Sequence, residues 1–286
     1  MIVITGATGQ YGRLVVENLL ERGVPAADIA VAVRTPARAA DLAGRGVTVR
    51  EADYDRPDTL VPAFAGADRL LLVSANGPDD LRIAQHRAAA AAAKEAGVGL
   101  LAYTSLFDAA RSPLSLARVH RASEEAVTAT GLPSVLLRNG WYTENYTAAL
   151  AGAVERGAIV GSAGRGRIAS AARADFAEAA AVVLTGDDHV GKVYELTGDT
   201  AWSLPELAAE VSLQSGREVV YTDLPADRYA EILLGAGLPG FLVETIVDAD
   251  VHVSRGALEP VTGDLAALLG RPATPLATSV GIALKG

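Results

Sequence analysis

The sequence predicts an α/β fold: a doubly wound parallel sheet with a smaller C-terminal α+β lobe. Three observations lead to this fold class. Short apolar runs alternate with helical patterns through the first two-thirds of the chain. Most of these runs are continuously apolar, as expected for strands that are covered on both faces. After Arg138 the regular alternation stops, and the last seventy residues read as mixed helix and loop.

The apolar runs predict seven strands, at residues 2–5, 29–34, 47–51, 69–74, 100–105, 134–138 and 193–197. Helical patterns between them cover residues 13–22, 85–96 and 123–130, and a further helix at 175–184 is expected to have Asp175 as its N-cap. Residues 152–166 are rich in glycine and are expected to be irregular. Residues 204–215 form an amphipathic pattern that starts with a capping box, Ser203 and Glu206.

Composition excludes several classes of protein. Half of the 286 residues are hydrophobic, which is enough for a large core, yet no apolar run reaches the roughly 20 residues of a membrane helix. The net charge of -9 disfavours nucleic acid as a partner. The absence of cysteine excludes disulfides, thiolate metal sites and a Cys nucleophile, and no metal site is expected. Because the first strand starts at Ile2, no signal peptide is expected, and we predict a cytoplasmic protein.

A glycine-rich loop follows the first strand and opens the first helix. Its sequence is Gly6-Ala7-Thr8-Gly9-Gln10-Tyr11-Gly12. Gly6 permits a tight turn, Gly9 lets the backbone approach a pyrophosphate, and Gly12 lets the helix pack closely on the strand. The helix N-terminus then offers free N–H groups to the phosphates. We therefore expect Gly6, Thr8, Gly9, Gln10, Tyr11 and Gly12 to bind a dinucleotide, as in a Rossmann domain.

The end of the second strand indicates which dinucleotide is bound. NAD sites carry an acidic residue there, whereas this chain has Arg34, whose charge suits the 2′-phosphate of NADPH. Arg38 and Thr35 are candidates to assist it. Alternatively, Arg34 is an ordinary solvated residue. Asp53 and Tyr54, just after the third strand, are candidates to contact the adenine ring, although a plain loop explains them almost as well.

Polar residues close the fourth and fifth strands. Ser74 ends one and Tyr103, Thr104 and Ser105 end the other. Ligands of such sheets bind at the carboxyl ends of the strands, so these side chains are candidate contacts for the ribose and nicotinamide. Equally, strand-end hydroxyl groups often bond only to the protein itself.

The proton relay of an ordinary short-chain dehydrogenase is missing. That relay needs Tyr-x-x-x-Lys, and none of the three lysines follows a tyrosine by four residues. The corresponding stretch reads His120-Arg121-Ala122-Ser123-Glu124. A quinone needs little acid catalysis, because its reduced form is a weak base, so His120 could supply the proton. Structural packing of His120 at the helix start is the equal alternative.

An aromatic segment follows the sixth strand. Asn139, Gly140, Trp141 and Tyr142 would lie where the nicotinamide end of the cofactor points. Asn139 offers an amide for a carbonyl and for the cofactor, and Tyr142 offers a flat face for a planar ring. Packing between the lobes is the alternative, and it is the favoured reading for Trp141.

Several segments resemble one family. These are the glycine loop, Ala102-Tyr103-Thr104-Ser105-Leu106, Leu137-Arg138-Asn139-Gly140-Trp141-Tyr142-x-Glu144-Asn145-Tyr146, Ile168-Ala169-Ser170-Ala171-x-Arg173-Ala174-Asp175 and Gly191-Lys192-Val193-Tyr194-Glu195-Leu196. They resemble the NAD(P)H:quinone oxidoreductase 2-like proteins, which are NmrA-like, atypical members of the short-chain dehydrogenase/reductase family. The resemblance covers nearly the whole chain. It implies two-electron reduction of quinones by NADPH without flavin, and a histidine in place of the catalytic tyrosine.

These observations predict an NADP-binding Rossmann domain at residues 1–140, completed by about 174–199, and a partly interleaved substrate-side lobe at 141–286. The expected catalytic residues are His120, Asn139 and Tyr142, the cofactor is NADPH and the partner is a quinone-like small molecule. A homodimer is compatible with this reading. Two other functions remain open: an NADP(H)-binding redox sensor without turnover, and an NADPH reductase of another electrophile.

Overall fold

A computed structural model describes residues 1–285 of the chain. The backbone divides into two compact units. Unit 1 comprises Met1–Ala109, Arg118–Asn139 and Phe176–Glu195. Unit 2 comprises Ala110–Ala117, Gly140–Asp175 and the chain from Leu196 onward. The chain therefore leaves unit 1 briefly at residues 110–117 and again after Asn139, and it returns for one further helix and strand.

Unit 1 is built on a seven-stranded sheet in the order β3-β2-β1-β4-β5-β6-β9. The first six positions follow the strand order of a Rossmann fold, so the predicted fold class is confirmed. The strands are β1 (Ile2–Thr5), β2 (Ile29–Val33), β3 (Thr48–Glu51), β4 (Arg69–Leu72), β5 (Leu100–Leu106), β6 (Ser134–Asn139) and β9 (Val193–Leu196). β1 pairs in parallel with β2 and β4, with Ile2 opposite Ile29 on one side and Arg69 on the other.

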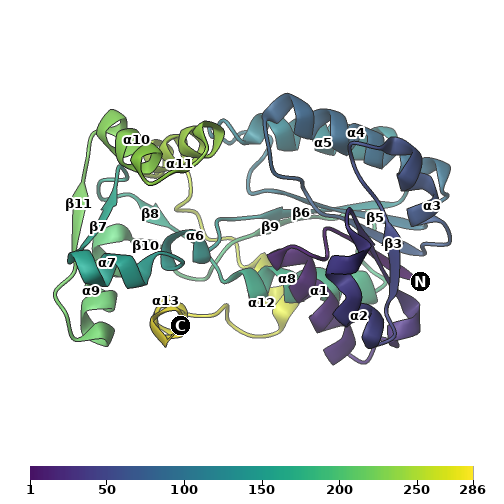
Figure 1. The fold of residues 1–286 in the computed structure, drawn as a ribbon, viewed down its shortest axis with the longest axis horizontal. Coiled ribbons are helices and arrows are strands. Elements are labelled where there is room, and N and C mark those ends of the chain that lie inside the picture. The colour runs from purple at the N-terminus through teal and green to yellow at the C-terminus, as the bar shows by residue number, and fades with distance from the viewer. Residues whose placement is uncertain (286) are drawn as a thin grey trace. The chain divides into compact units, whose positions relative to one another are not determined.

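Helices cover both faces of this sheet (Figure 1). In the view, α3 (Leu60–Phe64), α4 (Asp79–Glu95) and α5 (Ala117–Ala129) lie on one face, and α1 (Gln10–Glu21), α2 (Ala40–Gly44) and α8 (Arg173–Thr185) lie on the other. Three short 3₁₀ turns connect the strands: η1 (Ala26–Asp28), η2 (Pro36–Ala39) and η3 (Pro57–Thr59). The core between the sheet and α3–α5 is apolar and centres on Phe64, Leu70, Leu101 and Tyr103. The continuously apolar β2 is fully buried, and so is β5, which carries Tyr103, Thr104 and Ser105 near its end, as expected for strands that are covered on both faces.

Unit 2 contains two small sheets and several helices. β7 (Ala158–Gly161) pairs in parallel with β11 (Val220–Asp223), and β8 (Arg167–Ile168) pairs antiparallel with β10 (Trp202–Ser203). The helices are α6 (Glu144–Thr147), α7 (Leu150–Arg156), α9 (Leu204–Ser215), α10 (Ala226–Gly235), α11 (Gly240–Val253), α12 (Asp264–Leu269) and α13 (Leu276–Lys285). The capping box predicted for α9 is present, with Ser203 and Glu206 bonding reciprocally.

Two expectations for the local structure were wrong. Residues 152–161 are regular, because α7 ends at Gly157 in a left-handed cap and β7 follows directly, and only residues 162–166 form an irregular turn. Asp175 does not cap α8, since the helix starts at Arg173. The carboxylate of Glu144 instead accepts hydrogen bonds from the Arg173 backbone N–H, at 2.9 and 3.0 Å.

A buried carboxylate lies in the interior of unit 2. Asp250, on α11, is 3 % exposed, and its Oδ2 accepts a hydrogen bond of 2.8 Å from Ser162 N. A Cβ added to Gly161 would lie 2.9 Å from the same oxygen, so β7 can approach α11 only because this residue is glycine. Burial raises the pKa of Asp250 to about 6, and the charge of Asp223 adds to the effect. At neutral pH the folded protein therefore holds an ionised carboxylate that burial disfavours.

We expect Asp250→Asn to stabilise the protein above pH 6. The folded pKa is raised above that of the unfolded chain, so Asp250 stabilises the fold when protonated and loses this contribution as the pH rises from about 4 to 6. Asparagine stays neutral and still accepts from Ser162, so the gain in unfolding free energy at pH 8 should be about 1–2 kcal/mol. Urea unfolding at pH 5 and pH 8 measures it. An equal effect at both pH values would contradict the assignment.

Candidate functional site

The glycine loop joins β1 to α1 at the carboxyl edge of the sheet. Gly6 has a φ of +63°, a backbone conformation that favours glycine. Gly9 is the N-cap of α1 and provides no side-chain cap, and the first turn carries no acidic residue. The first helical hydrogen bond runs from Arg13 N to Gly9 O, which leaves the earlier N–H groups available to a phosphate. This geometry fits the pyrophosphate of a dinucleotide.

Gly12 sets how closely α1 approaches the loop. A Cβ at this position would lie 2.5 Å from Gly6 O and 2.9 Å from the Cα of Ala7, distances at which the backbone would have to move. Of the neighbouring side chains, Tyr11 is fixed by a 3.2 Å bond from its hydroxyl to Phe176 O, whereas Gln10 is exposed. Tyr11 is thus placed to contribute its backbone N–H and not its ring.

We expect Gly12→Ala to weaken NADPH binding at least tenfold and to lower the unfolding free energy by about 1–3 kcal/mol, because the added methyl group overpacks the loop. Calorimetric titration with NADPH and urea unfolding measure the two effects. Gly44→Ala is the matched control, since a Cβ there meets nothing within 4 Å. Unchanged affinity in Gly12→Ala would remove the loop from the cofactor site.

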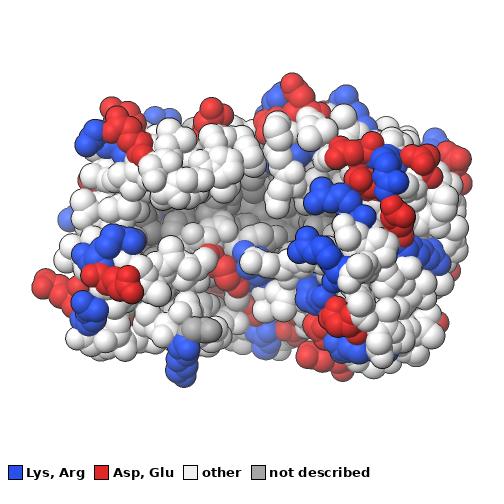
Figure 2. Space-filling view, in the orientation of Figure 1, with Lys and Arg blue, Asp and Glu red and all other residues white. Residues whose placement is uncertain are grey.

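The residues expected at the adenosine end fall into two groups. Arg34 and Arg38 are both exposed, just after β2, and neither makes an ion pair within the described part of the chain. Figure 2 shows basic side chains among acidic ones over the region of α1 and α2. Tyr54 is anchored, because its hydroxyl donates to Thr5 Oγ1 at 2.7 Å. Asp53 forms an ion pair with Arg56, in which Oδ2 and Nε are 3.6 Å apart. Arg34 is thus free to meet a 2′-phosphate, whereas Asp53 and Tyr54 have structural partners.

The polar residues that close β4 and β5 bond to one another. The hydroxyl of Thr104 accepts a 2.9 Å bond from Ser74 N, and Ser74 Oγ accepts one of 2.9 Å from Arg82 Nη2. Ser105 Oγ donates to the carboxylate of Glu124. Tyr103 is fully buried. These side chains brace the carboxyl edge of the sheet, and their direct contact with a cofactor stays a prediction.

Two buried histidines, one on α4 and one on α5, both pack against Tyr103, with ring centroids 5.6 and 6.0 Å from that of the tyrosine. His86 uses both ring nitrogens: Nε2 accepts from Ala75 N at 2.9 Å, and Nδ1 lies 2.7 Å from Ser123 Oγ. His120, which is 5 % exposed, bonds through Nδ1 to the hydroxyl of Tyr103 at 3.1 Å. Burial, aided by the charge of Arg82, lowers the pKa of His86 to about 3 and that of His120 well below its usual value. Both rings are therefore neutral at physiological pH.

An ion cluster holds the end of β6, where Asn139 lies. Arg138 forms two bonds with Glu124, at 2.8 and 2.7 Å, and a third with Glu195 Oε1 at 2.7 Å. Hydrogen bonding to Glu124 raises the pKa of Arg138 still further. The next residue, Asn139, is 3 % exposed, and its backbone oxygen accepts a 2.8 Å bond from Phe107 N. The cluster therefore fixes the position of Asn139 in unit 1.

Within unit 2, the aromatic segment lies beside the Ala-Ser-Ala segment. Thr143 N donates to Ala171 O at 2.9 Å, and Tyr142 forms a bridge with Ala171. The guanidinium carbon of Arg173 lies 5.0 Å from the centre of the Tyr142 ring. Arg173 therefore lies over one face of the Tyr142 ring, a cation–π arrangement.

Sequence reasoning missed Arg82, which is 8 % exposed and lies on α4. Its Nε makes no hydrogen bond, and the guanidinium forms no ion pair, within residues 1–285. The only trace in the sequence is spacing, because Arg82, Gln85, His86, Ala89 and Ala93 follow the helical period and share the buried stripe.

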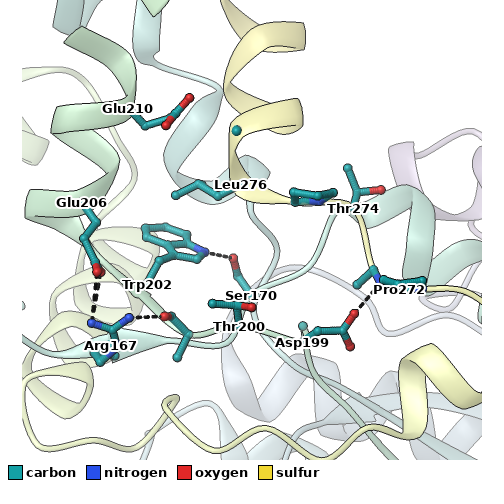
Figure 3. A pocket seen from close by; sticks show the side chains of 15 residues that line it. Arg167, Ser170, Asp199, Thr200, Trp202, Glu206, Glu210, Pro272, Thr274 and Leu276 are labelled. Atoms are coloured by element: carbon teal, nitrogen blue, oxygen red, sulfur yellow. Dashed lines mark hydrogen bonds and ion pairs between the residues drawn. The ribbon is translucent and has the colours of Figure 1, made fainter. Parts of the chain in front are cut away.

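Unit 2 contains a separate cavity of about 470 Å³. Figure 3 shows Trp202 at its centre, with its indole N–H bonded to Ser170 Oγ at 3.0 Å. Asp199 holds the opposite wall by accepting a 2.7 Å bond from Ala273 N. The chain from Pro272 to Ala277 forms this wall. No cluster of three or more His, Cys, Asp or Glu residues fit for a metal ion is found within residues 1–285, and no helix there could span a membrane.

Comparison with known proteins assigns the chain to a family. The profile of an NAD(P)H-binding family matches residues 6–187. Quinone oxidoreductase 2 of Escherichia coli is 48% identical over 98% of this chain and 97% of its own length. The chain belongs to the quinone oxidoreductase 2 family. A crystal structure of the NADPH-dependent Escherichia coli enzyme in complex with NADPH superposes with a TM-score of 0.95 over 99% of this chain and 100% of that one.

Other members of this wider group carry different names. The crystal structure of triphenylmethane reductase from Citrobacter sp. complexed with NADP(H) is 39% identical, with a TM-score of 0.95 over 99% of this chain and 100% of that one. An NAD(P)H azoreductase of Xenophilus azovorans is 28% identical over 97% of this chain and 96% of its own length. The expected NAD(P)H-binding Rossmann fold and the resemblance to the quinone oxidoreductase 2 branch are confirmed.

Proposed function

We propose that this protein is an NADPH-dependent quinone oxidoreductase. The observation that carries the proposal is near-full-length identity of 48% to quinone oxidoreductase 2, together with a glycine loop whose geometry fits a dinucleotide. Arg34 would bind the 2′-phosphate, and the N–H groups of α1 would bind the pyrophosphate. When bound, NADPH supplies the hydride. Asn139 and Tyr142 would orient the acceptor ring, and His120 would supply a proton.

The proposal predicts that the protein consumes NADPH when simple benzoquinones or naphthoquinones are present. The loss of the absorbance of the reduced nicotinamide measures this consumption. We expect saturable turnover that prefers NADPH to NADH. Binding of NADPH without turnover on any acceptor would reject the enzyme and favour a redox sensor. The cytoplasmic location and the homodimer stay predictions, and size-exclusion chromatography with light scattering tests the latter.

A second candidate activity is the reduction of other planar electrophiles. It is favoured by the relatives that are named as a triphenylmethane reductase and an azoreductase. A parallel panel of triphenylmethane and azo dyes measures it. Higher kcat/KM on a dye than on every quinone would make the dye class the preferred substrate.

A further inference from the structure

We propose that Tyr103 and His120 form a proton relay, in which His120 gives a proton to the reduced quinone and Tyr103 replaces it, with the buried charge of Arg82 supporting the transfer. This inference rests on the proposed function, because it assumes that His120 faces the acceptor. It adds a residue whose ring lies wholly inside the core, so Tyr103 acts through His120 and is a positioning residue.

His120 is neutral in the folded protein. The ring is almost completely buried, and its neighbours include the cationic Arg82 and the neutral His86. These surroundings disfavour the imidazolium form, so His120 does not hold a spare proton. Any proton that it gives away must be its single N–H proton and must be replaced from a neighbour.

The contact with Tyr103 determines which nitrogen of His120 carries that proton. Tyr103 Oη lies 3.1 Å from His120 Nδ1, and a phenol O–H donates readily to an unprotonated imidazole nitrogen. The proton of His120 is then on Nε2. This nitrogen makes no hydrogen bond within residues 1–285. It is also not one of the fully buried side-chain atoms that lack a hydrogen-bond partner, so it remains available to a ligand. The same logic fixes the tautomer of many metal-bound and catalytic histidines.

His86 shows what a purely structural histidine looks like in the same core. Its Nε2 accepts from Ala75 N, so its proton must be on Nδ1, from which it donates to Ser123 Oγ. Ser123 Oγ in turn donates to Val119 O at 2.7 Å. Both nitrogens of His86 are occupied by the protein, whereas His120 leaves one unoccupied. The two rings therefore carry opposite tautomers.

Arg82 supplies the electrostatic support. It is a buried cation without a carboxylate partner among the described residues, and its Nη2 bonds to Ser74. Burial raises the pKa of Tyr103 to about 12, while interactions with the hydroxyl groups of Ser123 and Ser74 and the charge of Arg82 oppose this rise. Arg82 thus disfavours a cationic histidine and favours a transient phenolate, as the relay requires.

A hydride from NADPH, with its two electrons, converts the quinone to a hydroquinone monoanion. The bond between His120 Nε2 and its proton breaks, and the monoanion becomes a neutral hydroquinone. The Tyr103 O–H bond breaks as Nδ1 of His120 takes that proton, which leaves a phenolate. After the product leaves, water protonates Nε2, and Nδ1 returns its proton to Tyr103, so one solvent proton is consumed for each quinone.

The tautomers can be observed without turnover. The chain has four histidines, so nitrogen-15 NMR of protein labelled at histidine gives a small set of signals. We expect His120 to be protonated at Nε2 and His86 at Nδ1 in the wild type. In Tyr103→Phe, the Nδ1 signal of His120 should shift while that of His86 stays in place. A wild-type His120 protonated at Nδ1 would overturn the relay without recourse to any variant.

The kinetic test uses a series of benzoquinones. Tyr103→Phe keeps the ring and removes the proton, and Tyr194→Phe is the matched control, because Tyr194 also bonds to a histidine, His189 Nδ1, at 2.7 Å. With electron-rich methylated quinones, whose reduced forms are the stronger bases, kcat should fall on the order of tenfold to a hundredfold in Tyr103→Phe. With chlorinated quinones the loss should be about twofold or less. Tyr194→Phe should follow the wild type throughout.

The outcomes separate the relay from the function. An equal loss of kcat on every quinone would show that Tyr103 is only structural and would overturn the relay. Wild-type protein that reduces no quinone would overturn the proposed function and, with it, the relay. Turnover by the wild type together with full activity of Tyr103→Phe would overturn the relay alone.

Discussion

Replacing Asp175 by alanine is expected to lower the unfolding free energy by about 2–4 kcal/mol, because it removes a buried acceptor of three hydrogen bonds, one of them from the half-exposed Arg271. Asp175 is 1 % exposed. Its Oδ1 accepts from Arg271 Nη2 at 2.8 Å and from the Thr274 hydroxyl at 3.0 Å, and its Oδ2 accepts from Thr274 N at 2.7 Å. The Asp175 carboxylate therefore accepts hydrogen bonds from both donors of Thr274. It also forms an ion pair with Arg271, which lies almost a hundred residues later in the sequence.

Urea unfolding at pH 7 measures this effect, and Asp187→Ala provides the control. Asp187 also pairs with an arginine, Arg69, at 2.8 Å, but its side chain is 92% exposed, so its loss should cost about 0–1 kcal/mol. The loss of unfolding free energy in Asp175→Asn should lie between those of Asp175→Ala and Asp187→Ala. The amide still accepts one hydrogen bond, but it leaves Arg271 without a counter-charge. A loss in Asp175→Ala no larger than in Asp187→Ala would show that residues 271–274 are held by other contacts.

Replacing Arg34 by glutamate is expected to reverse the cofactor preference. A guanidinium forms charge-assisted bonds with a 2′-phosphate, whereas a carboxylate repels the phosphate and can bond to the 2′-hydroxyl group of NADH. We expect the ratio of kcat/KM for NADPH to that for NADH to fall about a hundredfold, which corresponds to about 2.7 kcal/mol. Direct titration of each nucleotide gives the same comparison without turnover.

The control for Arg34→Glu is Arg217→Glu, which makes the same change of charge at an exposed position of unit 2. Arg217→Glu should leave the ratio of kcat/KM for NADPH to that for NADH unchanged. Any change that it does cause is a general effect of net charge and can be subtracted from the effect of Arg34→Glu. If the ratio is also unchanged in Arg34→Glu, Arg34 is an ordinary solvated residue, and Arg38 becomes the candidate for the phosphate contact.

The sequence predicted the sheet well because its evidence is local. β1 and the glycine loop are read from an apolar run that stops at Gly6, and each glycine has a steric reason that can be stated in advance. The ends of α9 were predicted to the residue, because Ser203 and Glu206 form a capping box and Gly216 ends the helix in a left-handed conformation. Such features depend on neighbours a few residues apart.

Features that depend on distant partners were missed. Asp175 reads as a helix cap because Asp is favoured there, yet its carboxylate bonds to Arg271 and Thr274. The glycines of 152–166 suggested loop, but Gly161 is needed inside a strand because Asp250 leaves no room for a side chain. Apart from its helical spacing, nothing in the local sequence marks Arg82 for burial, since an arginine on a helix is usually solvated.

The path of the chain also governs how the protein is assembled on the ribosome. The Rossmann unit lacks its edge strand β9 and helix α8 until Glu195 has been synthesised, and Gly140–Asp175, which belong to unit 2, emerge before those pieces. A nascent chain that stops near Asn139 exposes the open side of β6, where Leu136 N later bonds to Lys192 O. Such an unpaired strand edge is prone to aggregate. Unit 1 can therefore be completed only after Glu195 has been synthesised, and we expect a fragment that ends near Asn139 to be a poor substitute for the intact cofactor-binding unit.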